Sequence, residues 1–108
     1  MPDQMDARAL LHSLAGRRIV TVTGRPNTVL SVEGDTVVVA TRRSPTRVPV
    51  EWVQEGLDRL LKAGEIEISV RTLGHRSSFI GAVLLTLPGA ALVRTTPPRI
   101  RLNDPASA

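Results

Sequence analysis

Apolar and polar residues recur with a helical period in three segments of the chain, 6–15, 50–63 and 77–87. Residues that suit helix ends bound these segments. Asp6 can accept a hydrogen bond from a free amide of the first turn, and Gly64 can close the second segment in a left-handed conformation. The pattern therefore predicts three helices.

The third segment is the most apolar, and its start is basic and rich in hydroxyl groups. Ser77 or Ser78 is expected to cap this helix, and Pro88 ends it because proline cannot continue a helix. We expect the body of the helix to be buried and its first turn, next to Arg76, to face solvent. Free amides and the helix dipole make such an end suitable for a phosphate or another anion. The alternative is an ordinary core helix with a solvated cap.

Other apolar runs have the alternation or the β-branched composition that is typical of strands. They lie at residues 19–23, 28–32, 36–41, 65–70, 91–93 and 100–102. Glu33-Gly34-Asp35 separates two of these runs, and a three-residue gap that contains glycine predicts a hairpin. We expect the 19–23 run and the hairpin of residues 28–41 to share one sheet.

These elements predict a small α+β domain in which a β-hairpin or mixed sheet packs with about three helices, an arrangement loosely like a winged helix. The 108 residues suit one domain. We expect residues 1–5 to be a flexible N-terminus, 6–102 to form the domain and 103–108 to be a disordered tail. Trp52 and Phe79 are the aromatic residues of the chain. The core is therefore predicted to be aliphatic, with Trp52 mostly buried against the third helix.

Charge is unevenly distributed along the chain. Of the 14 basic residues one is lysine, and the formal net charge is +4. Arginines occur without an acidic residue in 17–32, 42–47 and 71–101, whereas 51–67 holds five acidic residues. This split predicts a surface with a basic side and an acidic side. The planar guanidinium suits phosphate, although a GC-rich genome also raises arginine content.

The chain lacks the residue sets that common enzymatic mechanisms need. It has no cysteine, neither histidine lies at metal-ligand spacing from another ligand, and no glycine-rich phosphate loop occurs. We therefore expect no catalysis by this chain, no cofactor, no metal and no small-molecule substrate. No apolar run approaches the roughly 20 residues of a membrane helix, and the first residues do not resemble a signal peptide. We expect a cytoplasmic protein that has no membrane partner.

The predicted arrangement is loosely similar to winged-helix DNA-binding domains. It has two helices, a third helix with a polar first turn, and a β-hairpin. In those domains a helix end enters the major groove and the hairpin follows the backbone. The chain is therefore predicted to bind duplex DNA through phosphate contacts. The candidate binding residues are Arg42, Arg43 and Arg47 from the loop after the hairpin, Arg71, Arg76, Ser77 and Ser78 around the third helix, and Arg25 and Asn27 as weaker candidates. The alternative is that each arginine is an ordinary surface residue without a partner.

Five short runs also carry a family resemblance. They are Leu-Ala-Gly-Arg-Arg-Ile (14–19), Thr-Gly-Arg-Pro-Asn (23–27), Val-Ala-Thr-Arg-Arg-Ser-Pro (39–45), Val-Pro-Val-Glu-Trp-Val-Gln (48–54) and Gly-His-Arg-Ser-Ser-Phe-Ile-Gly-Ala-Val-Leu (74–84). In this order they resemble the N-terminal head domain of ScoMcrA-like proteins, which are actinobacterial type IV, modification-dependent HNH restriction endonucleases. The resemblance covers about residues 8–102, and this chain has His75 where such heads are expected to carry tyrosine.

In that family the head precedes modules that recognise phosphorothioated or methylated DNA, and a C-terminal HNH nuclease. None of these follows in the present sequence. The resemblance therefore implies a DNA-associated accessory module in a restriction or defence setting, without cleavage. The alternative is a protein–protein module that docks on a nuclease partner or forms a homodimer through the acidic face of the second helix, with no direct DNA contact.

Overall fold

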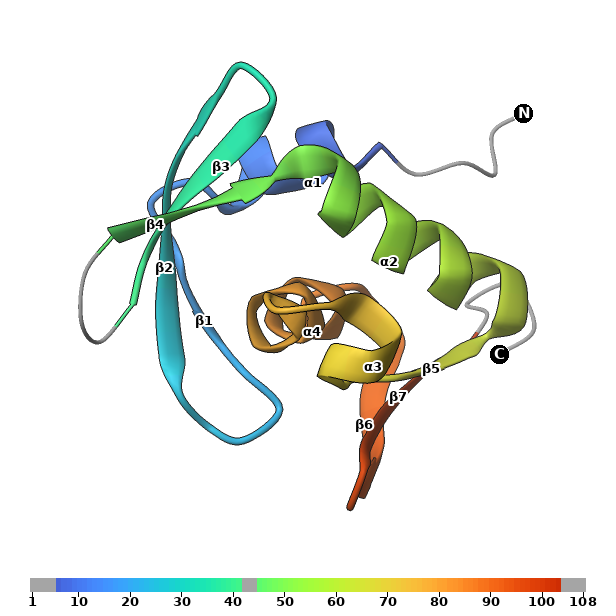
Figure 1. Cartoon of the computed structure of the whole chain (residues 1–108). Helices are drawn as coiled ribbons and strands as arrows, with labels where there is room; N and C mark the ends of the chain where they lie inside the picture. Colours follow the sequence, from blue (N-terminus) through green and yellow to red (C-terminus); the bar gives the residue numbers. More distant parts are fainter. Residues whose placement is uncertain (1–5, 42–44, 104–108) are drawn as a thin grey trace.

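A central helix, α4 (Ser77–Leu85), lies between a four-stranded sheet and a second layer made of helix α2 (Val50–Ala63) and a β-hairpin (Figure 1). This arrangement is seen in a computed structural model, which describes residues 6–41 and 45–103. Within these ranges, helices pack against two antiparallel sheets, which confirms the predicted α+β class.

The other elements follow along the chain. They are α1 (Ala7–Leu14), β1 (Arg18–Val20), β2 (Pro26–Glu33), β3 (Thr36–Ala40), β4 (Pro45–Pro49), β5 (Glu65–Glu67), α3 (Val70–Leu73), β6 (Ala90–Thr95) and β7 (Pro98–Leu102). In the part of the chain that the structure describes, the strand order is β1-β2-β3-β4 in one sheet and β5-β7-β6 in the other.

The predicted hairpin forms between β2 and β3. Glu33 pairs with Thr36, which leaves Gly34 and Asp35 as the two residues of the turn, and Gly34 has the positive φ of 58° that such turns favour. β1 pairs with β2 on the other side. The shared sheet is therefore confirmed, although β1 covers only residues 19 and 20 of the predicted 19–23 run.

The edge strand β4 occupies residues that were predicted as a loop. Its sequence is Pro-Thr-Arg-Val-Pro, and proline disfavours a strand because it lacks the N–H of the ladder. β4 lies at the edge of its sheet, where proline is tolerated. Val48 in its middle is fully buried, so tertiary packing outweighs the poor local propensity.

Helix α4 is buried along its body, as its apolar composition predicted. Residues 79–84 are all buried, whereas Arg76 and Ser78 at its start are exposed. A glycine allows α2 to come close, because a Cβ added at Gly56 would lie 2.8 Å from Ile80 Cγ2. The contact between α2 and α4 therefore depends on the absence of a side chain.

The expected serine cap of α4 does not form. Arg76 occupies the N-cap position without a side-chain hydrogen bond, and Ser77 is the first helical residue and only 7% exposed. The short helix α3, which was not predicted, comes just before it; the Ser69 hydroxyl accepts a hydrogen bond from Thr72 N. The chain then turns at Gly74, which has a φ of 83°. This turn, rather than a serine, decides where α4 begins.

From α2 onward, the elements follow the order helix, strand, two helices and two strands. β5 pairs with β7, and β7 pairs with β6, so the final hairpin lies beside the first strand of this unit. This order of connections fits the predicted arrangement, which is loosely like a winged helix. In winged-helix proteins the third helix enters the DNA groove, but here the four-stranded sheet covers α4, of which Ser78 alone is exposed. The first turn is therefore the part of α4 that a ligand can reach.

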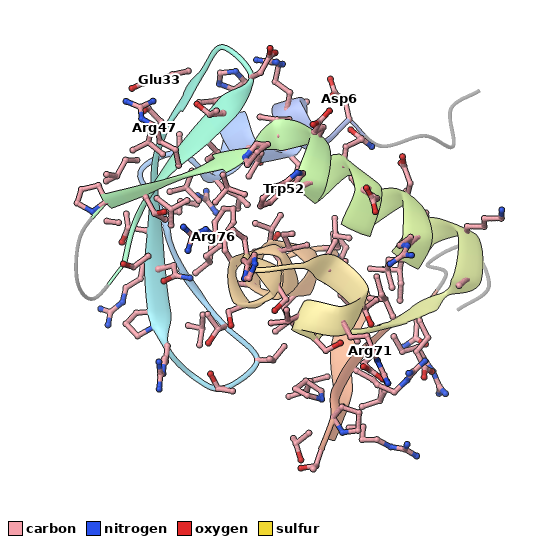
Figure 2. The ribbon with its side chains drawn as sticks, in the orientation of Figure 1. Asp6, Glu33, Arg47, Trp52, Arg71 and Arg76 are labelled. Atoms are coloured by element: carbon pink, nitrogen blue, oxygen red, sulfur yellow. The ribbon has the colours of Figure 1, made fainter. Side chains whose placement is uncertain are left out.

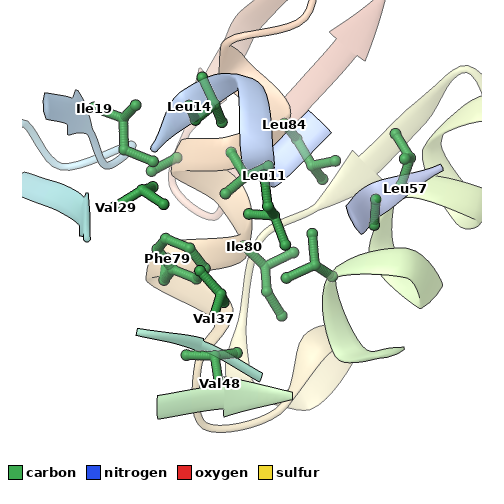
Figure 3. Close-up of a cluster of buried hydrophobic side chains, with 14 of the residues drawn as sticks. Leu11, Leu14, Ile19, Val29, Val37, Val48, Leu57, Phe79, Ile80 and Leu84 are labelled. Atoms are coloured by element: carbon green, nitrogen blue, oxygen red, sulfur yellow. The ribbon is translucent and has the colours of Figure 1, made fainter. Parts of the chain in front are cut away.

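One aliphatic core joins the two layers (Figure 3). Its fully buried members include Leu11, Val29, Val37, Val48, Leu57, Ile80 and Leu84. Trp52 is 39% exposed and lies at the surface of α2, so its predicted burial is wrong. Branched aliphatic side chains fill the space between the layers without the indole.

Backbone hydrogen bonding continues one residue beyond the last strand, β7. Asn103 N donates to the Gly89 carbonyl at 3.0 Å, so the ordered chain extends one residue beyond the predicted domain boundary. The predicted flexible N-terminus, 1–5, and residues 104–108 of the predicted tail lie outside the described residues. In the part that is described, no helix has both the length and the apolar character needed to cross a membrane.

Candidate nucleic-acid interface

A cleft of about 970 Å³ lies between the four-stranded sheet and the start of α4. The turn between β1 and β2 forms one wall, the facing ends of β3 and β4 form a second, and residues 75, 76, 78 and 79 form a third. The lining residues are Thr21, Gly24, Arg25, Pro26, Asn27, Thr41, Thr46, His75, Arg76, Ser78 and Phe79. None of these lining residues is acidic, so the cleft favours anions.

Thr21 holds the wall formed by the β1–β2 turn. Its Oγ1 accepts a hydrogen bond from Arg25 N at 3.0 Å, and its own N–H donates to the Arg25 carbonyl at 2.8 Å. Gly24 N donates to the Thr21 carbonyl at 2.9 Å, and Gly24 has a φ of 87°. Because Thr21 is only 5% exposed, the turn is tied to the body of the protein and holds Arg25 at the rim of the cleft.

The opposite wall contains the N-terminus of α4. Ser77 N donates to the Gly74 carbonyl at 3.2 Å, but the next two amides, of Ser78 and Phe79, have no acceptor among the described residues. Amides of a first helical turn lack an acceptor within their own helix. They also lie at the positive end of the helix dipole. This wall therefore presents two N–H donors together with partial positive charge.

Like Thr21, Asn27 is a buried polar residue of the cleft. It is 8% exposed and lies on β2 opposite Ile19, which faces the core. Its side-chain amide makes no hydrogen bond within the described structure, yet neither polar atom is sealed from solvent. Asn27 lines the cleft, and its amide is open to solvent. A polar group in a mostly buried residue without a protein partner is usually paired by water or by a ligand.

Two guanidinium groups add full positive charge to these donors. Arg25 and Arg76 are exposed, and neither side chain has a hydrogen-bond or ion-pair partner within residues 6–41 and 45–103. Figure 2 shows Arg76 between α4 and the four-stranded sheet. A free guanidinium keeps all its donors available to an incoming carboxylate or phosphate.

The structure brings four of the predicted binding residues together in this cleft, namely Arg25, Asn27, Arg76 and Ser78. Ser77 adjoins them but is buried and does not line the cleft. Arg42 and Arg43 were the first candidates from the sequence, and both lie outside the described residues.

Arg47 and Arg71 lie elsewhere and have acidic partners. Arg47 is on β4 rather than in a loop, and its Nη1 lies 3.1 Å from Glu33 Oε1. Hydrogen bonds from Ser31 and Arg47 lower the pKa of Glu33. Arg71 Nη2 lies 3.6 Å from Glu67 Oε2. Both arginines are exposed, but a phosphate would have to compete with a carboxylate for them.

The basic stretch 71–101 is partly neutralised by the acidic stretch before it. Arg99 Nε donates to Glu65 Oε2 at 2.5 Å, and Arg101 Nη2 donates to Glu65 Oε1 at 3.2 Å. These bonds, above all the one from Arg99, lower the pKa of Glu65. The charge split of the sequence therefore becomes, in this region, a set of ion pairs across β5 and β7.

Sequence reasoning missed the supporting role of Thr21, which was taken as part of a strand. A signal was present, because a threonine shortly before Gly24-Arg25-Pro26 is suited to a turn that its own hydroxyl closes. Thr46 was also missed, since β4 was not predicted.

Metal chemistry has no evident site in the described part of the chain. Within residues 6–41 and 45–103, no group of three or more histidine, aspartate or glutamate residues is placed to hold an ion.

A second concavity, of about 390 Å³, lies beside α3. Trp52 and Val70 line it and are 39% and 59% exposed. Glu55 and Arg71 flank them. The exposed indole of Trp52 and the exposed side chain of Val70 suit a protein side chain better than a phosphate.

The fold and the cleft together define a class, a small α+β domain with winged-helix connections and a basic cleft at the start of its central helix. Comparison of the chain with protein-family models, with curated proteins and with solved structures finds no match. The resemblance to ScoMcrA-like heads therefore remains a prediction from the sequence runs.

Proposed function

We propose that this protein is a non-catalytic nucleic-acid-binding module that holds duplex DNA through phosphate contacts at the basic cleft. The observation that carries the proposal is the convergence of Arg25, Arg76 and the free first turn of α4 on one cleft without an acidic lining residue. Phosphate contacts supply most of the affinity of sequence-independent DNA binding.

Burial of α4 limits how the domain can read DNA. A winged helix that lays its third helix in the major groove exposes a full helical face. Here that face packs against the four-stranded sheet, so base readout by α4 is sterically blocked. Binding that depends on phosphates, with little sequence preference, fits this geometry best.

The resemblance to ScoMcrA-like heads supports a restriction or defence setting, in which a cytoplasmic accessory module would keep a nuclease system on DNA. The first turn of α4, with Arg76 and Ser78, lies in one of the five matching runs, and Arg25 and Asn27 lie in another. The matching runs thus include the residues that line the cleft, except Thr21 and Thr46.

The test is fluorescence anisotropy with a labelled duplex over a series of salt concentrations. Each phosphate contact contributes about −0.9 to the slope of log K against log salt. The double variant Arg25→Gln with Arg76→Gln should therefore flatten the slope by roughly 1.8 and leave the fold intact. Arg42 and Arg43, the candidates from the sequence, can also be replaced by glutamine and tested by the same salt series.

The matched control is Arg17→Gln with Arg94→Gln. Both arginines are exposed, have no ion-pair partner among the described residues and lie outside the cleft lining. The control removes the same charge and should change the slope much less. Equal effects of the two double variants, or no binding at low salt, would count against the proposal that duplex DNA binds at the cleft.

The exposed Trp52 favours a second candidate function, docking on a protein partner such as a nuclease or a second copy of the chain. Aromatic residues are enriched at the centres of protein interfaces. In a pull-down with a co-encoded nuclease, or in a sedimentation measurement of self-association, Trp52→Ala should weaken the complex if docking is the function. The Arg25 and Arg76 variants should not.

A further inference from the structure

We propose that the start of α4 is a discrete binding site for a single phosphate group, with Asn27 as its floor and Arg25 and Arg76 at its rim. The inference deepens the proposed function and rests on it in one respect, that the phosphate belongs to a nucleic acid. The cleft would then hold one particular phosphate rather than spread its charge along a backbone.

The donors at this site are complementary to a phosphate group. Ser78 N and Phe79 N are free first-turn amides, and they lie at the positive end of a nine-residue helix. Backbone amides at a helix start form a common phosphate site, because the N–H groups point at the anion. The guanidinium groups of Arg25 and Arg76 can each donate two parallel hydrogen bonds to phosphate oxygens.

Asn27 distinguishes this helix start from an ordinary solvated one. The residue is more than nine-tenths buried and lines the same cleft, and its side-chain amide has no partner within the described residues. The folded protein therefore holds a donor beneath the space in front of α4. A phosphate oxygen that accepts from Asn27 and from the amides would satisfy groups that are otherwise unpaired.

The charge around the site favours an anion with several oxygens. The cleft lining contains two arginines and no carboxylate, and Thr46 and the Ser78 hydroxyl offer further polar contacts at its edge. A phosphate presents enough acceptor oxygens to use amides, a carboxamide and guanidinium groups at once.

The experiment is a titration of the full chain, labelled with ¹⁵N, with sodium phosphate at constant ionic strength, followed by NMR. We expect saturable shifts centred on the Ser78 and Phe79 amides and on the Asn27 side-chain NH₂. Shifts that are spread over the surface, or that sodium chloride reproduces, would overturn the site.

Substitutions make the test sharper. Asn27→Asp replaces the donor with a charge that repels phosphate, and Asn27→Leu removes the donor at similar volume. Each should weaken phosphate binding about tenfold or more, as expected for the loss of one hydrogen bond to a charged group. Thermal melting checks that the variants fold. If Asn27→Asp does not fold, the phosphate affinity of Asn27→Leu decides whether Asn27 belongs to the site. Unchanged phosphate affinity in a folded Asn27 variant would overturn the site.

Arg76→Gln and Arg94→Gln form a matched pair for the charge. Both remove one exposed arginine, and only Arg76 lines the cleft. We expect a loss of about tenfold in phosphate affinity for Arg76→Gln and little change for Arg94→Gln. Equal losses would show that net charge, rather than a site, attracts the ion.

Competition identifies the source of the phosphate. Duplex DNA without terminal phosphates should displace inorganic phosphate from the Ser78 and Phe79 amides if an internal phosphate occupies the site. Displacement only by a 5′-phosphorylated duplex would assign the site to a strand end. Phosphate binding without competition by either duplex would refute the proposed function and leave a free phosphorylated molecule as the ligand. DNA binding that depends on the arginines, without a saturable phosphate site, would refute the inference alone.

Discussion

A single buried hydroxyl holds one of the two cleft arginines in place. Thr21 Oγ1 accepts from Arg25 N, and the Thr21 peptide group makes two further hydrogen bonds in the same turn. The position of a charged side chain thus depends on a neutral residue four positions earlier. The charge itself could be read from the sequence, but its placement comes from this turn.

Thr21→Val tests that dependence at nearly constant volume. The Thr21 hydroxyl bonds to Arg25 N and to the Thr23 hydroxyl, and loss of each bond should lower the free energy of unfolding by about 0.5–1.5 kcal/mol. Duplex DNA affinity should also fall although no charge is removed, because Arg25 is less well held. Anisotropy and urea unfolding would measure the two effects. Thr23→Val is the control, because it removes only the bond between the Thr21 and Thr23 hydroxyls and leaves the bond from Arg25 N in place. A stable variant with unchanged affinity would contradict the role of Thr21.

Trp52 illustrates how exposure changes the expected cost of a substitution. Because the indole is 39% exposed, Trp52→Ala should cost roughly 1–2 kcal/mol, below the ~3–5 kcal/mol of a buried aromatic residue. Leu57→Ala, at a fully buried position, should cost about 2–5 kcal/mol. Urea unfolding followed by circular dichroism suits both variants, because Trp52 is the chain's one tryptophan. A larger loss for Trp52 than for Leu57 would show that the indole supports the core.

At the scale of elements, two strands are held together by charge as well as by their ladder. Glu65 on β5 accepts from Arg99 and Arg101 on β7. The same carboxylate lies on the strand that connects α2 to α3. The ion pairs therefore join the final hairpin to the unit that presents the first turn of α4.

The lowered pKa of Glu65 predicts how stability depends on pH. A carboxylate with a lower pKa in the folded than in the unfolded chain stabilises the fold above its unfolded pKa, near 4.5, and this contribution disappears as pH falls through the folded pKa. Glu65→Gln should therefore lower the melting temperature at pH 7, and the difference should shrink as pH falls below about 4.5. Glu51→Gln, on the exposed face of α2, is the control. A constant difference between pH 7 and pH 3 would contradict this account.

At the scale of the whole molecule, the winged-helix unit and the four-stranded sheet share one core. Phe79 and Ile80 of α4 belong to the same buried cluster as Val29 and Val37 of the sheet. Removal of the sheet would expose the apolar face of α4 to water.

We therefore expect a fragment of residues 50–103 to fail to fold by itself, despite its complete set of connections. Its thermal and urea transitions should be broad, and its NMR amide shifts poorly dispersed. The full chain under the same conditions is the control and should unfold cooperatively. A cooperative transition of the fragment would show that the two layers are independent domains.

Much of the fold could be read from local pattern. The bounds of α2, the Asp6 cap of α1 and the turn of the β2–β3 hairpin depend on residues close in sequence, and each follows from spacing or from backbone geometry. Likewise, the buried body and open first turn of α4 follow from its apolar run and polar start. Local information is sufficient where the stabilising contacts are themselves local.

Features that depend on partners far along the chain could not be read in this way. Strand β4 exists because an edge of the sheet accepts prolines. Arg47 and Arg99 are paired because strand register places carboxylates beside them. The cleft joins Asn27 to Arg76, nearly fifty positions apart, because the sheet packs on the start of α4. Charge and hydrophobicity are properties of residues, but which charges remain free and which amides stay unpaired is decided when distant surfaces meet.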